Sequence, residues 1–308
     1  MTEQTIDVHR TIPAAPERVY RAWLAPETIS RWLAPASLSV HRVEVDERVG
    51  GVLRVWQRDA AGTDVGGAEA EIVELSSPER IVLRWWFVGP DREKDPELET
   101  RLTVTFARTE DDRTRLHLHH ARLDGLRARM PAVADNVAAG WGSTLDGLHA
   151  QTVLDDPVAQ ELLNSAIPAR MAYTGLDGGP RVVPMGFWWN GTETVLCTAD
   201  VAPKVRALRA DPRLAITIDT EGQPPHVLLL RGTATIEIVD GVPEEYIRAS
   251  GKLVDESGMA AFEAQVRAMY ERMARIVLRP SWVKILDFET RAPDFVLQLA
   301  AKAGQTAR

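Results

Sequence analysis

The stretch 37–123 constrains the fold most, because apolar and polar side chains alternate through successive short segments separated by turns. Val43 and Val45 alternate with Arg42, and the same period of two returns in VLRVW, RIVLRWWF, LTVTF and LHLH. This alternation predicts an antiparallel meander with one apolar face. Apolar residues at helical spacing then follow over residues 131–153. We therefore expect a curved sheet wrapped around one long helix, with an interior cavity that suits an apolar ligand.

Composition narrows the class of protein. A chain of 308 residues is long enough for about two domains, and a formal charge of −8 argues against a general nucleic-acid binder. Cys197 is the single cysteine, so no intrachain disulfide forms, and we expect a reducing, cytoplasmic setting. The opening MTEQTIDVHR has no signal-peptide pattern, and no apolar run approaches the length of a membrane span.

A short break at Asp155-Asp156-Pro157 divides the chain. Proline here favours the start of a new helix, and the pattern changes after it to a second set of strands. We place one domain at residues 1–154, a second at 155–295, and a mobile tail at 296–308. The sequence therefore predicts an α+β protein with two successive antiparallel domains.

The first half contains TIPAAPERVYRAWLAPETISRWLAP, SSPERIVLRWWF, TRLTVTFA, TRLHLHHARL and GWGSTLDGLHAQ. These segments resemble the START-like helix-grip superfamily, most closely the bacterial homologues of the heat-shock-protein ATPase activator. The resemblance covers nearly all of residues 5–152 and implies a fold more strongly than a function. Members of the superfamily bind hydrophobic molecules or catalyse varied reactions. We expect the cavity of this domain to be lined by Trp56, Trp85, Phe87 and Trp141.

Three histidines in the last predicted strand of this half raise the question of a metal site. His117 and His119 share one face of the strand, whereas His120 shares the other face with two leucines. The leucines should face the interior, which places the histidine pair outside. No neighbouring carboxylate or cysteine completes a site of known spacing, so no metal site is expected. Arg84 and Glu71 are expected to form a surface pair.

In the second half, TADVAPKVRALRADPRLAITID combines a strand end, a loop, a short basic helix and another strand. Pro203 suits the first turn of the helix, and Asp211-Pro212 ends it. The hydroxyl of Thr198, the free N–H groups at the start of the helix and the Lys204 ammonium make a seat for phosphate. A solvated basic helix is the alternative explanation.

Strands surround this seat. RVVPMGFWW contains Pro184, which confines its strand to a sheet edge, a bulge or the rim of a ligand site. Asn190-Gly191 marks a hairpin, and Gly232 lies inside the long strand HVLLLRGTATIEIVD, where glycine allows a bulge or a close backbone approach. Residues 275–287 predict one final strand, interrupted by a proline. Together they predict a small antiparallel barrel.

The order of these segments resembles the flavin-binding split-barrel family of pyridoxamine-phosphate-oxidase-like proteins over about residues 158–292. KVRALRADPRLAIT is the most specific match, and RVVPMGFWW and VLLLRGTA support it. The resemblance implies a flavin lying along the barrel, usually at a dimer interface. It implies FMN, with the deazaflavin coenzyme F420 as the alternative. No side chains match a set that binds pyridoxal phosphate, which argues against vitamin B6 oxidation.

The resemblance also assigns residues. Those bordering the isoalloxazine ring would be Arg181, Val182, Val183 and Pro184. Thr198 and Lys204 would hold the phosphate, with Arg206 or Arg209 assisting. Trp282 and Lys284 of the last strand would approach the cofactor, from this subunit or from the partner subunit of a homodimer.

These expectations lead to one principal hypothesis of function. The chain would be a two-domain, flavin-dependent oxidoreductase of a small organic molecule, fused to a domain that binds an apolar molecule. The alternative is a non-catalytic protein that binds flavin or another ligand as a sensor or contacts a chaperone. Enzymatic activity of the first domain ranks last, because its predicted interior shows no acid–base pair.

Overall fold

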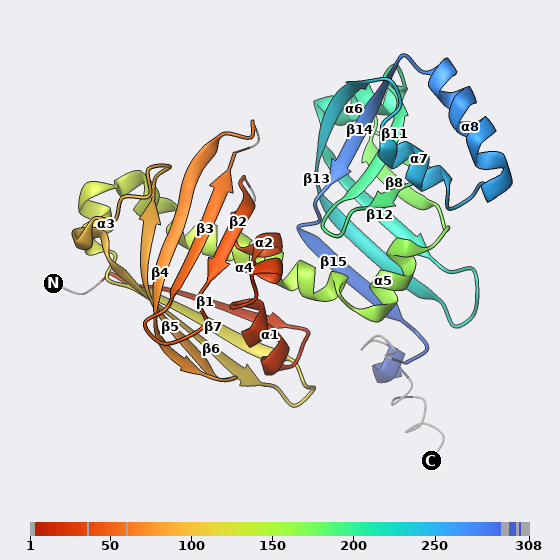
Figure 1. Cartoon of the computed structure of the whole chain (residues 1–308). Helices are drawn as coiled ribbons and strands as arrows, with labels where there is room; N and C mark the ends of the chain where they lie inside the picture. The colour runs from red at the N-terminus through yellow and green to blue at the C-terminus, as the bar shows by residue number, and fades with distance from the viewer. Residues whose placement is uncertain (1–3, 36, 60, 291–295, 300–301, 303–308) are drawn as a thin grey trace. The chain divides into compact units, whose positions relative to one another are not determined.

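The computed structural model describes residues 4–35, 37–59, 61–290, 296–299 and 302. It divides into two compact units, Met1–Thr152 and Val153–Arg308, called here the N-terminal and the C-terminal unit (Figure 1). Both are built on antiparallel sheets with helices, so the α+β class expected from the sequence is confirmed. Of the predicted tail, 296–299 and 302 are helical. Its other residues lie outside the described part.

One seven-stranded sheet forms the N-terminal unit, in the order β1-β7-β6-β5-β4-β3-β2. The first strand pairs with the last, so strands far apart in the sequence become neighbours. Edge strands are β1 and β2. The strands are β1 (Ile6–Ile12), β2 (Ser39–Val45), β3 (Val52–Arg58), β4 (Asp64–Ser76), β5 (Arg80–Val88), β6 (Thr100–Arg108) and β7 (Thr114–Ala121).

Helices cover one face of this sheet. The sheet curves around the long helix α4 (Pro131–Leu154), as Figure 1 shows. Apolar residues of α1, α2 and α4 pack with the inward residues of the strands into one core, which includes Trp23, Trp32 and Trp141. This is the helix-grip arrangement that the alternation and the long helical run predict. The shorter helices are α1 (Pro16–Ala22), α2 (Pro26–Trp32), the 3₁₀ helix η1 (Pro96–Leu98) and α3 (Asp124–Arg129).

The C-terminal unit contains an eight-stranded antiparallel sheet, in which β10-β11-β14-β13-β12-β8-β9 follow one another and β15 also pairs with β13. Pro184 lies in β9, which is at one end of this order, as expected for a proline at a sheet edge. The strands are β8 (Ala169–Thr174), β9 (Pro180–Met185), β10 (Trp188–Trp189), β11 (Thr194–Ala199), β12 (Arg213–Asp219), β13 (His226–Asp240), β14 (Arg272–Leu278) and β15 (Trp282–Asp287).

The long strand β13 organises this unit. Its first half pairs with β12 and β15, and its second half pairs with β14. The single final strand predicted over residues 275–287 is therefore wrong: β14 and β15 are separate strands on different halves of β13. Gly232 lies at the change of partner, where a Cβ atom would come within 3.0 Å of the Arg279 carbonyl oxygen. The expected close backbone approach is confirmed.

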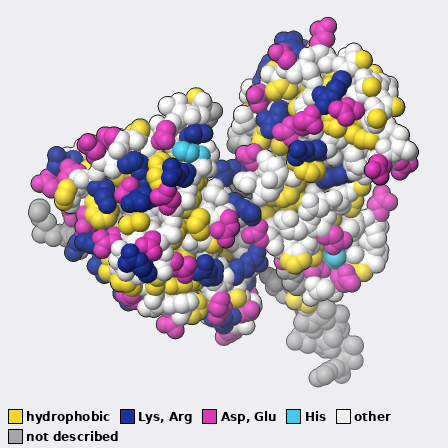
Figure 2. Space-filling model, viewed as in Figure 1, with side chains coloured by type: hydrophobic (Ala, Val, Ile, Leu, Met, Phe, Trp, Pro, Cys, Tyr) yellow, Lys and Arg dark blue, Asp and Glu magenta, His cyan; other side chains and the backbone are white. Residues whose placement is uncertain are grey.

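The helices that accompany these strands before residue 270 are α5 (Pro157–Asn164), α6 (Pro203–Ala210), α7 (Glu244–Ser250) and α8 (Glu256–Met269). Both α5 and α6 begin at a proline, which suits a first turn because its missing N–H would lack a helical partner anyway. Among the described residues, no helix is long and apolar enough to cross a membrane. Basic and acidic side chains are interspersed over the visible surface of each unit (Figure 2).

Candidate functional site

A cavity of about 330 Å³ lies between α4 and the sheet of the N-terminal unit. Apolar and aromatic side chains from the strands face helix residues such as Val133 and Val137 across it. Asn136, Thr144 and Gln57 contribute the polar lining. Such a cavity accepts a small, mostly apolar molecule.

Three of the four aromatic residues expected at this cavity line it, namely Trp85, Phe87 and Trp141. Trp56 does not. Its neighbours Val55 and Gln57 face the cavity, and alternation along β3 turns Trp56 to the other face of the sheet. There the guanidinium groups of Arg42 and Arg92 lie 4.7 and 4.3 Å from its ring centroid.

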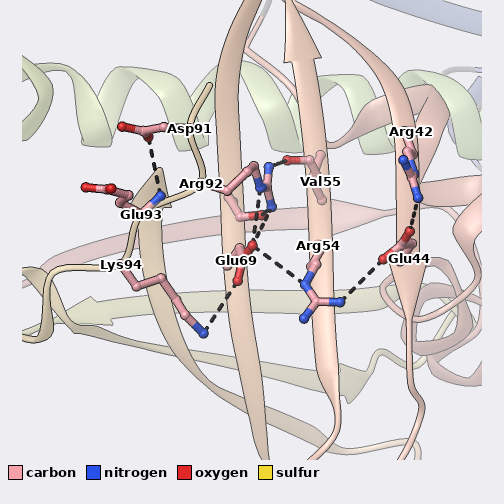
Figure 3. A network of polar contacts seen from close by, with 10 residues as sticks. Arg42, Glu44, Arg54, Val55, Glu69, Asp91, Arg92, Glu93 and Lys94 are labelled. Atoms are coloured by element: carbon pink, nitrogen blue, oxygen red, sulfur yellow. Dashed lines mark hydrogen bonds and ion pairs between the residues drawn. The ribbon is translucent and has the colours of Figure 1, made fainter. Parts of the chain in front are cut away.

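A charged network covers the strands on that outer face (Figure 3). Arg92 donates hydrogen bonds to the carbonyl oxygens of Val55 and Ala68, two residues that line the cavity. It also donates to the carboxylate of Glu69, which is only 8% exposed and pairs with Lys94 as well. Because the network ties β3 to β4, it fixes the wall of the cavity from outside. Sequence reasoning missed Arg92, since its loop position gives no periodic signal.

A buried histidine fixes the wall from inside. The Trp141 indole N–H donates to His120 Nδ1 at 2.9 Å, and His120 Nε2 donates to the Thr100 hydroxyl at 2.8 Å. The Thr100 hydroxyl donates in turn to the Trp85 carbonyl oxygen at 2.9 Å. Burial lowers the pKa of His120 to about 3, so the ring is neutral and both nitrogens are satisfied. This chain of bonds holds α4 against β5 beside the cavity.

The outward histidines also lie as expected, on the face of β7 opposite His120. The expectation that no carboxylate accompanies them is wrong, because Asp7 on the paired strand β1 contacts both His117 and His119. More than a hundred residues separate these side chains in the sequence, so only strand pairing brings them together. Arg84 and Glu71 form an ion pair whose side chains are partly exposed, as predicted.

In the C-terminal unit, the residues assigned to phosphate lie on two consecutive elements. Thr198 is in β11, and Lys204 is the second residue of α6. The helix has Ala202 at its N-cap and no side-chain hydrogen bond there. Within the described residues, Lys204, Arg206 and Arg209 have no ion-pair partner. Lys204 is half-buried, whereas both arginines are exposed.

The residues assigned to the ring lie on the edge strand β9. Val182 is 65% exposed, and Arg181 pairs with Asp177 in the preceding turn. Val183 is half-buried and Pro184 is exposed. Among the described residues, no strand pairs with the outer edge of β9. Its backbone groups on that side and the Val182 side chain are therefore exposed.

A row of five cross-strand neighbours connects β9 with β15. Val182 is opposite Ala172, Ala172 is opposite Ala215, Ala215 is opposite Arg231, and Arg231 is opposite Trp282. We call these five residues the outer row. The Arg231 guanidinium lies 4.2 Å from the Trp282 ring centroid. The small side chains of Ala172 and Ala215 therefore leave a shallow depression between Val182 and the stacked Arg231 and Trp282.

An open cleft of about 540 Å³ follows the outer row and includes Arg181 and Val182. Tyr173, Arg213 and Arg231 also line it, and the sequence analysis missed these three. For Arg213 a signal existed, because the alternation in RLAITID places it on the solvent face. The lining does not include Thr198, Lys204, Trp282 or Lys284. In strand order, β11 and β9 lie toward opposite ends of the sheet, so this chain does not gather the ring and phosphate residues in the cleft.

The single cysteine is not a reactive group of this site. Burial of Cys197 raises the pKa of its thiol to about 12, so the thiol stays protonated at neutral pH.

Comparisons with solved structures found chains that are similar to part of this chain. Protein CV1439 from Chromobacterium violaceum is 29% identical, with 47% of this chain and 94% of that chain covered and a TM-score of 0.39. Protein NE0264 from Nitrosomonas europaea is 20% identical, with 47% and 91% covered and a TM-score of 0.40. An HSP90 activator from Plasmodium falciparum is 24% identical, with 38% and 72% covered and a TM-score of 0.29. No curated protein matches the chain.

Family models match both halves. The model described as Activator of Hsp90 ATPase homolog 1-like protein matches residues 13–152, within the helix-grip unit. The model described as Pyridoxamine 5'-phosphate oxidase matches residues 156–296, within the antiparallel barrel-like unit. Each half of the chain is therefore similar to one family, the N-terminal half to Hsp90-activator homologues and the C-terminal half to pyridoxamine-phosphate-oxidase-like proteins.

Proposed function

We propose that the C-terminal unit binds a flavin nucleotide, FMN, and that the chain is a flavin-dependent oxidoreductase of a small organic molecule. The observation that carries this proposal is the family match over residues 156–296, which includes an unpaired Lys204 in the first turn of α6. The deazaflavin F420 remains the alternative cofactor, because its phosphate needs the same donors.

The start of α6 suits a phosphate group. Its first N–H groups point out of the helix, and the helix dipole places partial positive charge there. Ala202 offers no side chain that would compete for these donors. Lys204 adds a full positive charge, and the Thr198 hydroxyl precedes it on β11. Charge-assisted hydrogen bonds to a phosphate are about twice as strong as neutral ones.

The edge strand β9 suits the flat ring of a flavin. Backbone N–H and C=O groups on the free edge match the polar rim of the ring, and Val182 supplies an apolar contact. The flavin supplies the hydride chemistry when bound. The protein residues bind and orient it, and they exclude water from the face that meets the substrate.

A homodimer would complete this site. Val182, Arg231 and Trp282 of the outer row are exposed in one chain, and the phosphate and ring residues lie toward opposite ends of its sheet. A second copy packed on the outer row would cover Val182 and Trp282 and would bring residues of one chain toward the other. We propose this homodimer as the form that binds the cofactor.

The test is the absorbance spectrum of the purified protein, together with mass spectrometry of the material released by heat. We expect a flavin spectrum and released FMN. Lys204→Met should weaken FMN binding roughly 10- to 100-fold, which corresponds to about 1.5–3 kcal/mol for a charged hydrogen bond. Lys94→Met in the N-terminal unit is the control and should bind normally. A colourless protein that takes up neither cofactor on addition would overturn the proposal.

For the N-terminal unit we propose binding of an apolar molecule that carries one hydrogen-bond acceptor. The cavity is lined mainly by apolar side chains, and the Trp85 indole N–H is buried without a partner among the described residues. A carbonyl or ether oxygen on the ligand could accept this bond, which would relieve a cost of about 1–3 kcal/mol. The bound molecule would be the substrate or product of the flavin site.

A non-catalytic role for the whole chain is the second candidate, favoured by the absence of a described acid–base pair in the cavity lining. Reduction of the bound flavin followed by addition of candidate acceptors separates the two functions. Reoxidation faster than with buffer alone supports the enzyme, and an unchanged rate with every acceptor supports the binding protein.

A further inference from the structure

Asp7, His117 and His119 converge on the outer face of the N-terminal sheet. Asp7 Oδ1 lies 2.7 Å from His117 Nε2 and 2.9 Å from His119 Nδ1. Within the described residues, these three form the one group of histidine, cysteine or carboxylate side chains whose ligand atoms all lie within 4.8 Å of one another. Two imidazole nitrogens and one carboxylate oxygen are a donor set that binds divalent transition metals.

Strand pairing builds the group. Asp7 is opposite His119, and His9 is opposite His117, in the antiparallel pair β1–β7. Alternation turns the apolar partners Val8 and Leu118 toward the core and leaves the polar side chains on the outer face. The group therefore rests on two hydrogen-bonded strands and needs no loop to form.

A fourth polar side chain, His9, lies beside the group. His9 stacks on His117, with ring centroids 4.2 Å apart and planes inclined by 9°. This contact limits rotation of the His117 ring on its open side. The rings of His117 and His119 are both partly exposed, so an ion can reach them from solvent.

We propose that Asp7, His117 and His119 bind a divalent transition metal ion, with Zn²⁺ as the representative ion. Metal–ligand distances of about 2.0–2.2 Å in a tetrahedral site separate ligand atoms by roughly 3.3 Å, slightly more than the separations here. Small side-chain rotations would admit the ion. It would replace the two protons that now bridge the histidines to the carboxylate. Water or His9 would take the fourth position.

The electrostatics of the group agree with this chemistry. Hydrogen bonds from His119 and His117 lower the pKa of Asp7, so its carboxylate is charged and ready to bind a cation. The donor set should favour Zn²⁺, Ni²⁺ and Cu²⁺ over Mg²⁺ and Ca²⁺, which prefer oxygen ligands.

The bound ion would hold the edge strand β1 to β7, which are the first and the last strand of this sheet in the sequence. Because the unfolded chain does not hold these residues together, binding should raise the unfolding temperature of the N-terminal unit, and the rise should grow with the logarithm of the metal concentration.

The experiment is calorimetric titration of the full chain, freed of any histidine tag, with ZnCl₂ and separately with MgCl₂. We expect one equivalent of Zn²⁺ to bind and no heat from Mg²⁺. Asp7→Asn and His119→Gln should each weaken Zn²⁺ binding at least tenfold. The matched control is His41→Gln, which removes a histidine paired with a carboxylate, Asp64, at 3.3 Å but without a second histidine. It should bind as the wild type does.

Two results would overturn the proposal. Wild-type protein that neither binds Zn²⁺ nor shifts its unfolding temperature with Zn²⁺ would exclude the site. Zn²⁺ binding by Asp7→Asn with wild-type affinity would show that the carboxylate is no ligand and that the histidines act alone. Circular dichroism of each variant checks that the fold is retained, which these exposed positions should allow.

Discussion

The two units differ in where they place a binding surface. The N-terminal unit places its cavity between a sheet and a helix, and the described residues include two exposed large hydrophobic side chains, Val49 and Val65. The C-terminal unit displays more apolar groups on its surface. Eight of its described large hydrophobic side chains are exposed, Val182 and Trp282 among them.

This difference has a physical consequence. A cavity formed within one chain can bind its ligand without help, because that chain supplies all of its walls. A site on an open surface gains a dry wall only when a second molecule covers it. The same chain would thus bind one ligand as a monomer and the other as a dimer, and the following experiments separate the two cases.

The largest expected effect comes from a charge in the outer row. Val182→Glu would bury an unpaired carboxylate in the proposed dimer interface, which costs about 3 kcal/mol or more, or roughly a 100-fold loss of association. Sedimentation velocity should show a dimer for the wild type and a monomer for this variant. Leu253→Glu, at a residue of similar exposure outside the row, should stay dimeric. A dimeric Val182→Glu variant would place the interface elsewhere.

A smaller effect is expected from the buried histidine of the N-terminal unit. His120→Leu leaves the Trp141 indole N–H without a partner and removes the bond that the Thr100 hydroxyl accepts, which should lower the free energy of unfolding by about 2–4 kcal/mol at pH 7.5. Urea unfolding followed by tryptophan fluorescence measures this loss. The C-terminal unit contains no part of this hydrogen-bond chain and should unfold as before.

The same variant tests the pH dependence. Burial lowers the pKa of His120 to about 3, below the value of about 6.5 in the unfolded chain. The unfolded chain therefore takes up the proton first, and stability present above pH 6.5 is lost as the pH falls toward 3. At pH 5 the loss is about 2 kcal/mol. The gap between wild type and His120→Leu should narrow by that amount from pH 7.5 to 5, and a constant gap would contradict a neutral buried ring.

Sequence reasoning worked well for the N-terminal unit because its sheet alternates strictly. Period two placed His117 and His119 outside and His120 inside, and the run from 131 to 153 predicted α4 within a residue. Trp56 was misplaced among the cavity residues, although alternation with Val55 already turned it outward. Asp7 could not be connected with the histidines, because the pairing of β1 with β7 is a property of the assembled sheet and not of either strand.

For the C-terminal unit, the sequence predicted the elements but not how they pair. Its elements were readable, from the hairpin at Asn190-Gly191 to the helix that begins at Pro203. Their spatial relation was not, because β13 changes partners near Gly232 and separates β14 from β15. The cross-strand row that links Val182 to Trp282 depends on four separate registers. Local patterns determine none of these registers alone.

Substitution of two alanines in β4 tests whether the N-terminal cavity has room for a larger side chain. Ala68 lines the cavity, whereas Ala70, two residues along the same face of β4, is packed in the core. Ala68→Leu should fill the cavity with little loss of stability and should weaken binding of an apolar dye at least tenfold. Ala70→Leu should cost about 1–3 kcal/mol by overpacking. Equal stability losses in thermal unfolding would contradict an open cavity.

The smallest expected effect is a change of stability when either of two helical glycines of the N-terminal unit is replaced by alanine. A Cβ atom at Gly140 in α4 would meet nothing closer than Pro35 Cγ at 4.0 Å, whereas at Gly125 in α3 it would lie 2.2 Å from the Glu97 carbonyl oxygen. Gly140→Ala should therefore stabilise the unit by about 0.5–1 kcal/mol, because alanine loses less conformational entropy in a helix. Gly125→Ala should destabilise it, because the backbone must move.

Thermal unfolding of the two glycine variants measures changes of opposite sign, and both should appear in the transition of the N-terminal unit alone. A destabilising Gly140→Ala would mean that α4 lies closer to Pro35 than 4.0 Å permits, and the cavity beside Gly140 would then be smaller than its lining indicates. A stabilised C-terminal transition would show that the two units do not unfold independently. The two glycine variants thus test the size of the cavity and the independent unfolding of the two units, each by adding one methyl group.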